Sequence, residues 1–162
     1  MEKINYLHEE DLGAVIRRYS DMVYRLAFTR TGNESDAWDV SQEVFLRLVK
    51  HREKIKDEEH LKAWLLRVTL NCSNSVFRQI WSKTEELDMK MEATTEDPLQ
   101  RMAVMEAVMR LPVKFRTVIE LFYYEDLTVA QIAKVTKQKE GTVKTQLSRA
   151  RVMLRESLGE DF

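Results

Sequence analysis

Apolar and polar residues repeat with a helical period along most of the chain. This pattern predicts helices at about 10–30, 36–52, 60–81, 99–111, 112–124, 128–135 and 139–158. No segment has the strict alternation that is typical of a half-buried strand. The sequence therefore predicts an all-α protein.

Two polar segments interrupt this pattern. In TGNESD, residues 31–36, Gly32 and Asn33 favour a turn, and we expect Ser35 or Asp36 to cap the following helix. The second interruption, residues 82–98, is polar, acidic and closed by Pro98. The sequence thus predicts two small helical domains, 1–82 and 98–162, joined by a flexible acidic linker at 83–97. A solvated tether and a segment that occupies a partner's cleft both fit such a linker.

The last two predicted helices form a candidate helix-turn-helix. Thr128 and Gln131 have the spacing of a capping box, and the small residue Ala133 would let two helices cross closely. Gly159 can terminate the final helix. The pair therefore has the sequence features of a DNA-binding motif.

The final helix divides into three stripes. Val143, Leu147, Ala150, Leu154 and Leu158 form an apolar stripe that we expect to pack inward. Two polar stripes then remain outside, and in a major groove one could reach base edges while the other holds phosphates. The first has Thr142, Thr145, Gln146 and Arg149, and the second has Lys144, Ser148, Arg151 and Arg155. The alternative is an ordinary solvated helix.

Charge is segregated along the chain. The formal net charge of -1 first argues against a nucleic-acid partner. Between Thr128 and Arg155, however, seven Lys and Arg residues face Glu140 alone. Because a phosphate backbone responds to the local field, this segment remains a candidate DNA-binding surface.

Composition excludes several classes of function. No apolar run approaches the roughly 20 residues that a membrane span needs, so we expect a cytoplasmic protein without stable membrane insertion. Cys72 is the single cysteine, and we expect it to be a small buried residue rather than a reactive thiol. Three scattered histidines give no metal-ligand spacing. With no catalytic constellation and no phosphate loop, we expect no enzyme, metal or cofactor.

The helix at 36–52 is apolar over an unusually wide arc. Ala37, Val40, Val44 and Leu48 form a normal core stripe. A second stripe, about 100° away, contains Trp38, Phe45 and Val49, with Gln42 among them. Either the helix is wedged between two helices of its own domain, or this stripe docks onto a partner protein.

The helix at 60–81 carries a polar face opposite its core face. Core spacing is found for Leu61, Trp64, Leu65, Val68, Cys72 and Val76. The opposite face has Arg67, Asn71, Asn74 and Arg78, and amides flanked by guanidinium groups suit unpaired bases beside a phosphate track. A solvated polar face is the alternative.

These segments resemble one family. LTVAQIAKVTKQKEGTVKTQLSRARVMLRESL, residues 127–158, resembles the fourth conserved region of bacterial RNA polymerase sigma factors of the extracytoplasmic-function (ECF) type. DAWDVSQEVFLRL, residues 36–48, resembles the second conserved region, and LKAWLLRVTLN, residues 61–71, resembles the segment that reads the −10 element and opens the strands. The resemblance implies a factor that binds core polymerase, reads −35 and −10 promoter elements and promotes strand opening.

The resemblance also assigns roles to residues. It implies that the β′ coiled coil and β flap of core RNA polymerase, promoter DNA and an anti-sigma factor are partners. A base flipped out of the duplex would be captured by the loop at 55–60. The implied polymerase-binding residues are Trp38, Asp39, Gln42, Glu43, Phe45 and Val49. The residues implied to bind the single-stranded −10 element are Arg67, Asn71, Asn74 and Arg78. The residues implied to bind duplex DNA at the −35 element are Thr142, Lys144, Thr145, Gln146, Ser148, Arg149 and Arg151.

One segment departs from the family pattern. Lys137, Gln138 and Lys139 occupy the turn where the family usually has a glycine, so we expect a strained or altered backbone there. Two other hypotheses remain: a stand-alone helix-turn-helix regulator, and a helical adaptor that binds polymerase without reading promoters.

Overall fold

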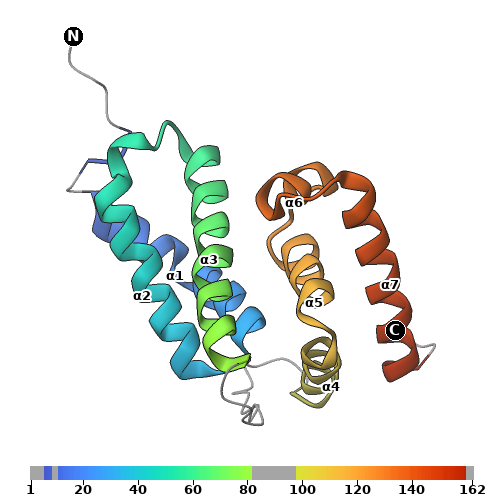
Figure 1. Ribbon diagram of the computed structural model, residues 1–162. Coiled ribbons are helices and arrows are strands. Elements are labelled where there is room, and N and C mark those ends of the chain that lie inside the picture. The colour runs from blue at the N-terminus through green and yellow to red at the C-terminus, as the bar shows by residue number, and fades with distance from the viewer. Residues whose placement is uncertain (1–5, 9–10, 82–97, 160–162) are drawn as a thin grey trace. The chain divides into compact units, whose positions relative to one another are not determined.

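The computed structural model describes residues 6–8, 11–81 and 98–159, with side chains for all of these except 76–81 and 98–101. Within these residues every regular element is a helix (Figure 1). The chain divides into two compact units, residues 1–86 and 87–162. The predicted linker, 83–97, lies outside the described residues, so its boundaries stay a prediction.

The first unit contains three long helices. They are α1 (Leu12–Thr31), α2 (Glu34–His51) and α3 (Glu58–Trp81), with a short 3₁₀ turn, η2 (Arg52–Lys54), after α2 (Figure 1). Each long helix packs against the other two. The apolar stripe predicted for α2 is buried, as are Leu26 of α1 and Leu65 of α3. These side chains form one core between the three helices.

The turn between α1 and α2 is built differently from the sequence prediction. Gly32 adopts φ 69°, and its N–H donates to the carbonyl of Phe28 at 2.7 Å. Asn33 is the N-cap of α2, and its Oδ1 accepts from the backbone N–H of Asp36 at 3.1 Å. The prediction that Ser35 or Asp36 caps α2 is therefore wrong, because the helix already begins at Glu34.

The core face of α3 is wider than its predicted stripe. Leu61, Leu65 and Cys72 are buried as predicted, whereas Trp64 and Val68 are only half-buried. The side chain of Val76 lies outside the described residues. Because α3 packs against both other helices, further residues are also buried, namely Leu66, Thr69, Leu70 and Ser73.

Hydroxyl groups inside this core are satisfied within the helix. Thr69 Oγ1 donates to the carbonyl of Leu65, and Ser73 Oγ donates to the carbonyl of Thr69, both at 2.6 Å. Cys72 is a buried free thiol whose pKa is raised by burial, in agreement with the predicted packing role. The α3 core thus holds small polar groups without leaving their donors unsatisfied.

The second unit is built around its last helix. Its elements are α4 (Pro98–Arg110), α5 (Val113–Ile119), a π-helical turn η3 (Glu120–Tyr124), α6 (Val129–Thr136) and α7 (Glu140–Leu158) (Figure 1). The predicted helix at 112–124 is thus α5 continued by η3, with Pro112 as its N-cap. Helix α7 packs against α4, α5 and α6. Val143, Leu147 and Ala150 are buried there, while Leu154 and Leu158 are half-buried.

Candidate nucleic-acid and protein interfaces

The helix-turn-helix begins with the predicted capping box. Thr128 Oγ1 accepts from the N–H of Gln131 at 3.1 Å, and the N–H of Thr128 donates to Gln131 Oε1 at 2.9 Å. These two bonds satisfy donors that a helix start otherwise leaves free. Helix α6 is therefore fixed at its first turn.

The turn between α6 and α7 contains a residue in a left-handed conformation. Lys137 has φ 56° and ψ 43°, the region that glycine occupies without steric cost. The N–H groups of Lys137 and Gln138 both donate to the carbonyl of Ala133. The turn therefore closes α6 as a glycine turn would, and the strain expected from the sequence falls on Lys137.

The outer surface of α7 carries most of the predicted DNA-binding residues. Thr142, Lys144, Thr145, Ser148 and Arg149 are exposed. Their polar groups face away from the Val143–Leu147–Ala150 stripe, so the surface combines hydroxyl, ammonium and guanidinium donors. Such a set suits both base edges and phosphates.

Gln146 does not lie on that exposed surface. Only 9% of its surface is exposed, and its side chain exchanges two hydrogen bonds with Gln138, at 2.8 and 3.2 Å. The prediction that Gln146 belongs to an outward-facing stripe is therefore wrong. The stripe was assigned from ideal helical rotation alone. It did not take into account the preceding turn, where the side chain of Gln138 covers Gln146.

Arg151 is held against the π-helical turn. Its Nε donates to Tyr123 Oη at 2.8 Å, and its guanidinium carbon lies 5.5 Å and 5.7 Å from the ring centroids of Phe122 and Tyr123. A guanidinium over aromatic faces gains cation–π attraction. Arg151 is thus half-buried and oriented, in contrast to the exposed Arg149.

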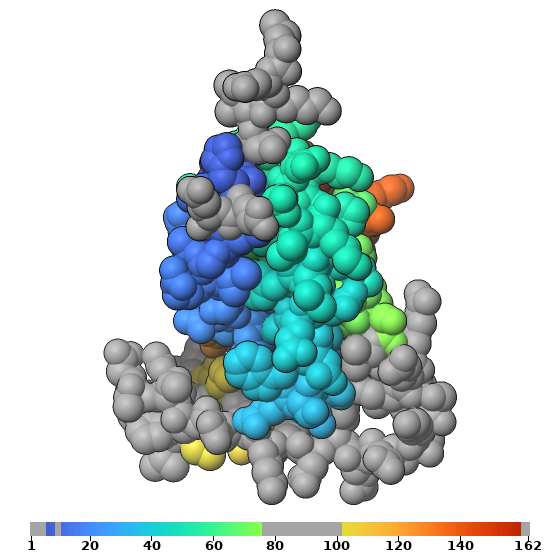
Figure 2. All heavy atoms as spheres, turned by 90° about the vertical axis from the view of Figure 1, so that its left-hand side faces the viewer, coloured from blue at the N-terminus to red at the C-terminus, as the bar shows by residue number. Residues whose placement is uncertain are grey.

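The second stripe of α2 is exposed. Trp38 is 59% exposed and Val49 is 39% exposed, whereas Phe45 is half-buried. Figure 2 views the first unit from the side on which α2 runs along the middle and α1 lies beside it. Helix α2 does pack against both α1 and α3, as the first alternative expected, but Trp38 and Val49 of its second stripe stay exposed, so docking onto a partner remains open.

Two further features of α2 concern this exposed surface. The ring of Trp38 packs against Tyr24 of α1, with centroids 5.1 Å apart. Leu46, which the sequence analysis did not include, is as exposed as Trp38 at 59%. The sequence signal for Leu46 was that it is an apolar residue on an otherwise polar face of the helix. The exposed aromatic and aliphatic area resembles a protein-binding surface.

The acidic and amide groups beside this surface are also accessible. Asp39, Gln42 and Glu43 are exposed on α2. Glu43 Oε1 accepts from Arg47 Nε at 3.0 Å, one helical turn further along. An exposed pair of this kind is weak, so Glu43 can exchange this partner for another cation at small cost.

The polar face of α3 is accessible over its described part. Arg67, Asn71 and Asn74 are exposed, and the side chain of Arg78 lies outside the described residues. Asn74 Oδ1 accepts from Arg30 Nη2 at the end of α1. Sequence reasoning missed Arg30, which is brought to this face only by packing between α1 and α3.

The loop before α3 is shorter than predicted. Helix α3 begins at Glu58, so the loop consists of residues 55–57 and the remainder of the predicted loop is helical. Asp57 Oδ1 accepts from the N–H of His60 at 2.7 Å, and the N–H of Lys56 donates to His60 Nδ1 at 3.0 Å. Ile55 is buried, which anchors the loop to the core.

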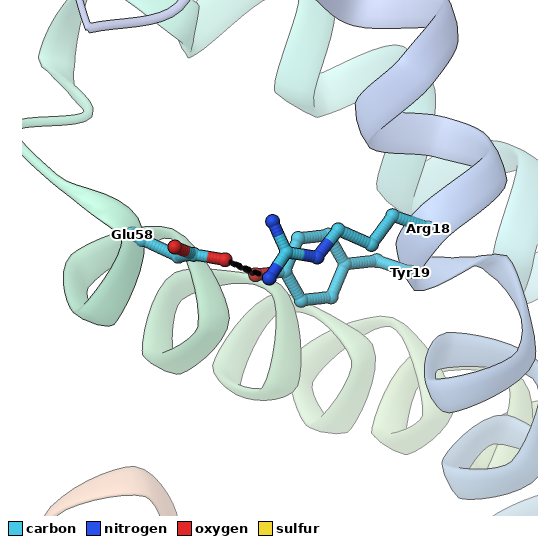
Figure 3. Close-up of polar contacts among 3 residues, drawn as sticks. All are labelled: Arg18, Tyr19 and Glu58. Atoms are coloured by element: carbon cyan, nitrogen blue, oxygen red, sulfur yellow. Dashed lines mark hydrogen bonds and ion pairs between the residues drawn. The ribbon is translucent and has the colours of Figure 1, made fainter.

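The start of α3 is also attached to α1 (Figure 3). Tyr19 Oη donates to Glu58 Oε1 at 3.1 Å, and Arg18 Nη2 forms an ion pair with the same oxygen. Burial and the Glu58 carboxylate raise the pKa of Tyr19. This contact joins α1 to the first turn of α3, directly after the short loop.

The described part of the chain contains no group of three or more potential metal ligands. Among its helices, none is long and apolar enough for a membrane crossing. The arrangement instead offers exposed polar, basic and aromatic surfaces. Such surfaces are typical of helical nucleic-acid-binding proteins that also contact a protein partner.

Comparison with known proteins identifies the family. The Sigma-70 region 2 family matches residues 15–82, and the Sigma-70, region 4 family matches residues 101–154. The chain belongs to the ECF-type RNA polymerase sigma factors, which direct transcription initiation at promoters and are not enzymes. The resemblance stated from the sequence is therefore confirmed, and it favours a sigma factor over the two alternative hypotheses.

Relatives match over most of their length. RNA polymerase sigma factor SigV of Bacillus subtilis is 30% identical over 141 residues, covering 85% of each chain. ECF RNA polymerase sigma factor SigL of Mycobacterium tuberculosis is 31% identical over 156 residues, covering 91% of this chain and 88% of SigL. Both region 2 and region 4 therefore have counterparts in these relatives.

Solved structures share the fold. The sigma factor RpoE of Bartonella quintana, in complex with the anti-sigma factor NepR, superposes with a TM-score of 0.83 at 20% identity, covering 94% of this chain and 99% of RpoE. CnrH, in complex with the cytosolic domain of CnrY, has a TM-score of 0.70 at 20% identity, covering 96% and 92%. The predicted all-α fold with sigma regions 2 and 4 is confirmed.

Proposed function

We propose that this sigma factor binds core RNA polymerase through α2, reads a −35 element with α7 and holds the separated −10 strand on α3. The observation that carries this proposal is the exposed Trp38 surface on α2, which occurs in the same chain as the exposed polar face of α7. A stand-alone DNA-binding role would leave the exposed Trp38 surface of α2 unexplained. A purely protein-binding adaptor would leave the exposed polar face of α7 unexplained.

Polymerase binding is assigned to six residues of α2. Trp38, Phe45 and Val49 would supply apolar anchor area for the β′ coiled coil, since buried aromatic residues dominate many interfaces. Asp39 and Glu43 would face basic groups on the partner, and Gln42 lies between them on the exposed side. Leu46 extends the same apolar area. The β flap would be a second contact, made by region 4.

Single-strand binding is assigned to the polar face of α3. Asn71 and Asn74 would hydrogen-bond unpaired bases, while Arg67 and Arg78 would follow the phosphates. The short loop at 55–57 would capture a base flipped out of the duplex. Ile55 and the hydrogen bonds of Lys56 and Asp57 to His60 anchor this loop, so the loop would not have to become ordered before it captures the base.

Duplex binding is assigned to α7. Thr142, Thr145 and Arg149 would contact base edges, and Lys144, Ser148 and Arg151 would contact phosphates. Tyr123 orients the Arg151 guanidinium before DNA arrives, which reduces the entropy lost on binding. The helix therefore combines contacts that specify a sequence with contacts that position the duplex.

Strand opening by this mechanism would not require ATP hydrolysis. If the α3 face binds the separated strand better than it binds duplex DNA, binding shifts the equilibrium toward the open complex. The free energy of that shift is limited to the difference between the two affinities. Catalysis of RNA synthesis belongs to the polymerase, and this chain supplies promoter selection.

We also propose an anti-sigma factor as a partner and the cytoplasm as the place of action. RpoE, which shares this fold, was solved in complex with the anti-sigma factor NepR, and CnrH was solved in complex with the cytosolic domain of CnrY. An inhibitor that covers exposed surfaces on both units would prevent polymerase and promoter binding together. For the predicted acidic linker at 83–97, which lies outside the described residues, a solvated tether and a segment in a partner's cleft both remain open.

Co-elution with core polymerase tests the central claim. The full chain should co-elute with bacterial core RNA polymerase, and a Gln42→Ala/Glu43→Ala variant should not, because both residues lie on the exposed α2 surface. Asp21→Ala, at an exposed position of α1, is the control and should bind normally. Absence of binding by the unaltered chain would instead support a stand-alone DNA-binding regulator.

A further inference from the structure

Two glutamine side chains join the turn of the helix-turn-helix to α7. Gln146 Nε2 donates to Gln138 Oε1 at 2.8 Å, and Gln138 Nε2 donates to Gln146 Oε1 at 3.2 Å. Each amide therefore acts toward the other as both donor and acceptor. Gln146 is buried, and Gln138 is half-buried. We call these two residues the amide pair.

The amide pair is continuous with α6. Gln138 Nε2 also contacts Thr136 Oγ1 at 3.0 Å, and Thr136 Oγ1 donates to the carbonyl of Ile132 at 2.7 Å. A chain of hydrogen bonds thus runs from the last turn of α6, through the turn, to the second turn of α7. Such a network restrains the crossing of the two helices in addition to their apolar contact.

Other restraints at this turn are weak. Lys137 has to adopt a left-handed conformation that costs a non-glycine residue free energy. Lys139, the N-cap of α7, makes no side-chain capping bond. The backbone around α7's first turn is therefore less firmly held than that of α6, whose capping box is complete.

The residues proposed to read bases surround the amide pair on α7. Thr142, Thr145 and Arg149 lie four, one and three positions from Gln146 along the helix. A rotation or shift of α7 about this point would move all three together, and hydrogen-bond readout tolerates displacements of only a few tenths of an ångström. Loss of the pair would consequently reduce discrimination between sequences more than general attraction to DNA.

We propose that Gln138 and Gln146 are positioning residues for promoter readout, because their paired side chains fix the recognition helix against the turn. The inference rests on the proposed reading of duplex DNA by α7. It also replaces the base-contacting role that the sequence assigned to Gln146. No new DNA contact is required of either side chain.

Two substitution cycles in the full chain test this proposal. In the first, Gln138→Met, Gln146→Met and the double variant keep side-chain length but remove hydrogen bonding. In the second, Gln138→Glu and Gln146→Glu each leave one bond to the remaining amide, whereas the double variant places two carboxylates face to face. Lys134→Met, at an exposed position of α6, is the control for an added apolar side chain.

The readout is sequence selectivity rather than stability. Duplexes bound by the unaltered chain are first selected from a randomised pool. Selectivity is then the affinity for the selected duplex divided by that for a scrambled duplex of equal length. Both affinities are measured at one salt concentration and below the melting temperature of every variant. The ratio cancels uniform electrostatic effects, including those of added or removed charges.

The two cycles should give opposite patterns. Each single Met variant leaves a buried amide without its partner and should lower selectivity about tenfold, while the double Met variant should return to within about threefold of the unaltered chain. In the Glu cycle the single variants should remain within about threefold, and the double variant should lose about tenfold or more. Lys134→Met should leave the ratio unchanged.

Other outcomes overturn the proposal. If Gln146 contacts a base directly, both Gln146 variants will lose selectivity, both Gln138 variants will keep it, and the doubles will follow Gln146. If all variants keep selectivity while their melting temperatures fall, the pair is only structural. If the unaltered chain selects no sequence from the pool, the proposed duplex readout fails, and with it the inference. If the unaltered chain does select a sequence but the two substitution cycles do not give the expected patterns, only the inference about the amide pair is rejected, and the proposed duplex readout stands.

Discussion

Arg151 of α7 is tied to Tyr123 of the π-helical turn by a 2.8 Å hydrogen bond from Nε to Oη. The two residues are separated by 28 positions in the chain, so the contact depends on packing of α7 against the preceding helices. The remaining guanidinium donors stay available to a phosphate because a guanidinium carries five N–H groups. Tyr123 thereby orients a cation at the edge of the proposed DNA surface.

Arg151→Ala should weaken duplex binding equally on selected and scrambled sequences. Because one phosphate contact is lost, the slope of log affinity against log salt should fall by about one. Tyr123→Phe should keep that slope, since the cation remains, and should lower affinity only about threefold through the lost orientation. Fluorescence anisotropy over a salt series measures both quantities. A change of sequence preference in Arg151→Ala would contradict the phosphate assignment.

Trp38→Ala should reduce core polymerase binding more than it reduces stability. Trp38 is 59% exposed and its ring contacts Tyr24, so its removal should lower the free energy of unfolding by about 1 kcal/mol or less. A central aromatic anchor of an interface, by comparison, contributes about 2 kcal/mol or more to binding. Titration of labelled polymerase and urea denaturation give the two values.

Val44→Ala is the matched control for that comparison. Val44 is fully buried on the core stripe of the same helix, and the substitution should cost about 2 kcal/mol of stability. Polymerase affinity should then be nearly unchanged under conditions where the variant remains folded. If Val44→Ala lowered polymerase affinity more than Trp38→Ala did, Trp38 would not belong to the proposed interface.

The sequence predicted what depends on local chemistry and periodicity. The core stripe of α2 and the Thr128–Gln131 capping box both follow from residues within a few positions of one another. Gly32 and Lys137 likewise mark turns in which one residue must be left-handed. These features required no knowledge of how helices pack.

Features that involve distant residues were not predicted. Gln146 lies on a polar stripe by rotation alone, but Gln138 covers it from a turn eight residues away. Arg30 reaches Asn74 only because α1 packs on α3. The cap of α2 was misplaced by a different cause, since Asn33, Ser35 and Asp36 are all good capping residues and the sequence alone did not rank them.

Asn71→Ala should impair open-complex formation more than polymerase binding. Asn71 is exposed on α3, so its loss should leave the fold and the α2 surface intact. If its amide contacts an unpaired base, the open complex should lose roughly 0.5–1.5 kcal/mol, a change that permanganate footprinting of unpaired thymines can follow. Glu59→Ala, exposed on the first turn of the same helix, is the control. Equal losses in footprinting and core binding would contradict the assignment.

Lys137→Gly should stabilise the second unit. Lys137 has φ 56°, and relief of this left-handed conformation offsets the extra unfolded-state entropy of glycine, with a net gain of up to about 1 kcal/mol. Asp126→Gly is a matched comparison, because Asp126 has φ 55° but aspartate tolerates this region better. Its gain should be smaller. Thermal denaturation of the full chain measures both, and a larger gain for Asp126→Gly would reverse the argument.

Tyr19→Phe should reduce the loss of stability at alkaline pH. Burial and then Glu58 raise the folded-state pKa of Tyr19 above its ordinary value of 10.0, so the folded state keeps the phenolic proton longer than the unfolded state does. This contribution is fully present below about pH 10 and is lost as pH rises from there through the raised folded pKa. The urea midpoint of the unaltered chain should therefore fall as the pH rises above about 10, and the midpoint of Tyr19→Phe should fall less steeply. Tyr124→Phe, at an exposed position of the second unit, should keep the slope of the unaltered chain. Identical slopes for Tyr19→Phe and the unaltered chain would show that the Tyr19–Glu58 contact does not favour the protonated phenol.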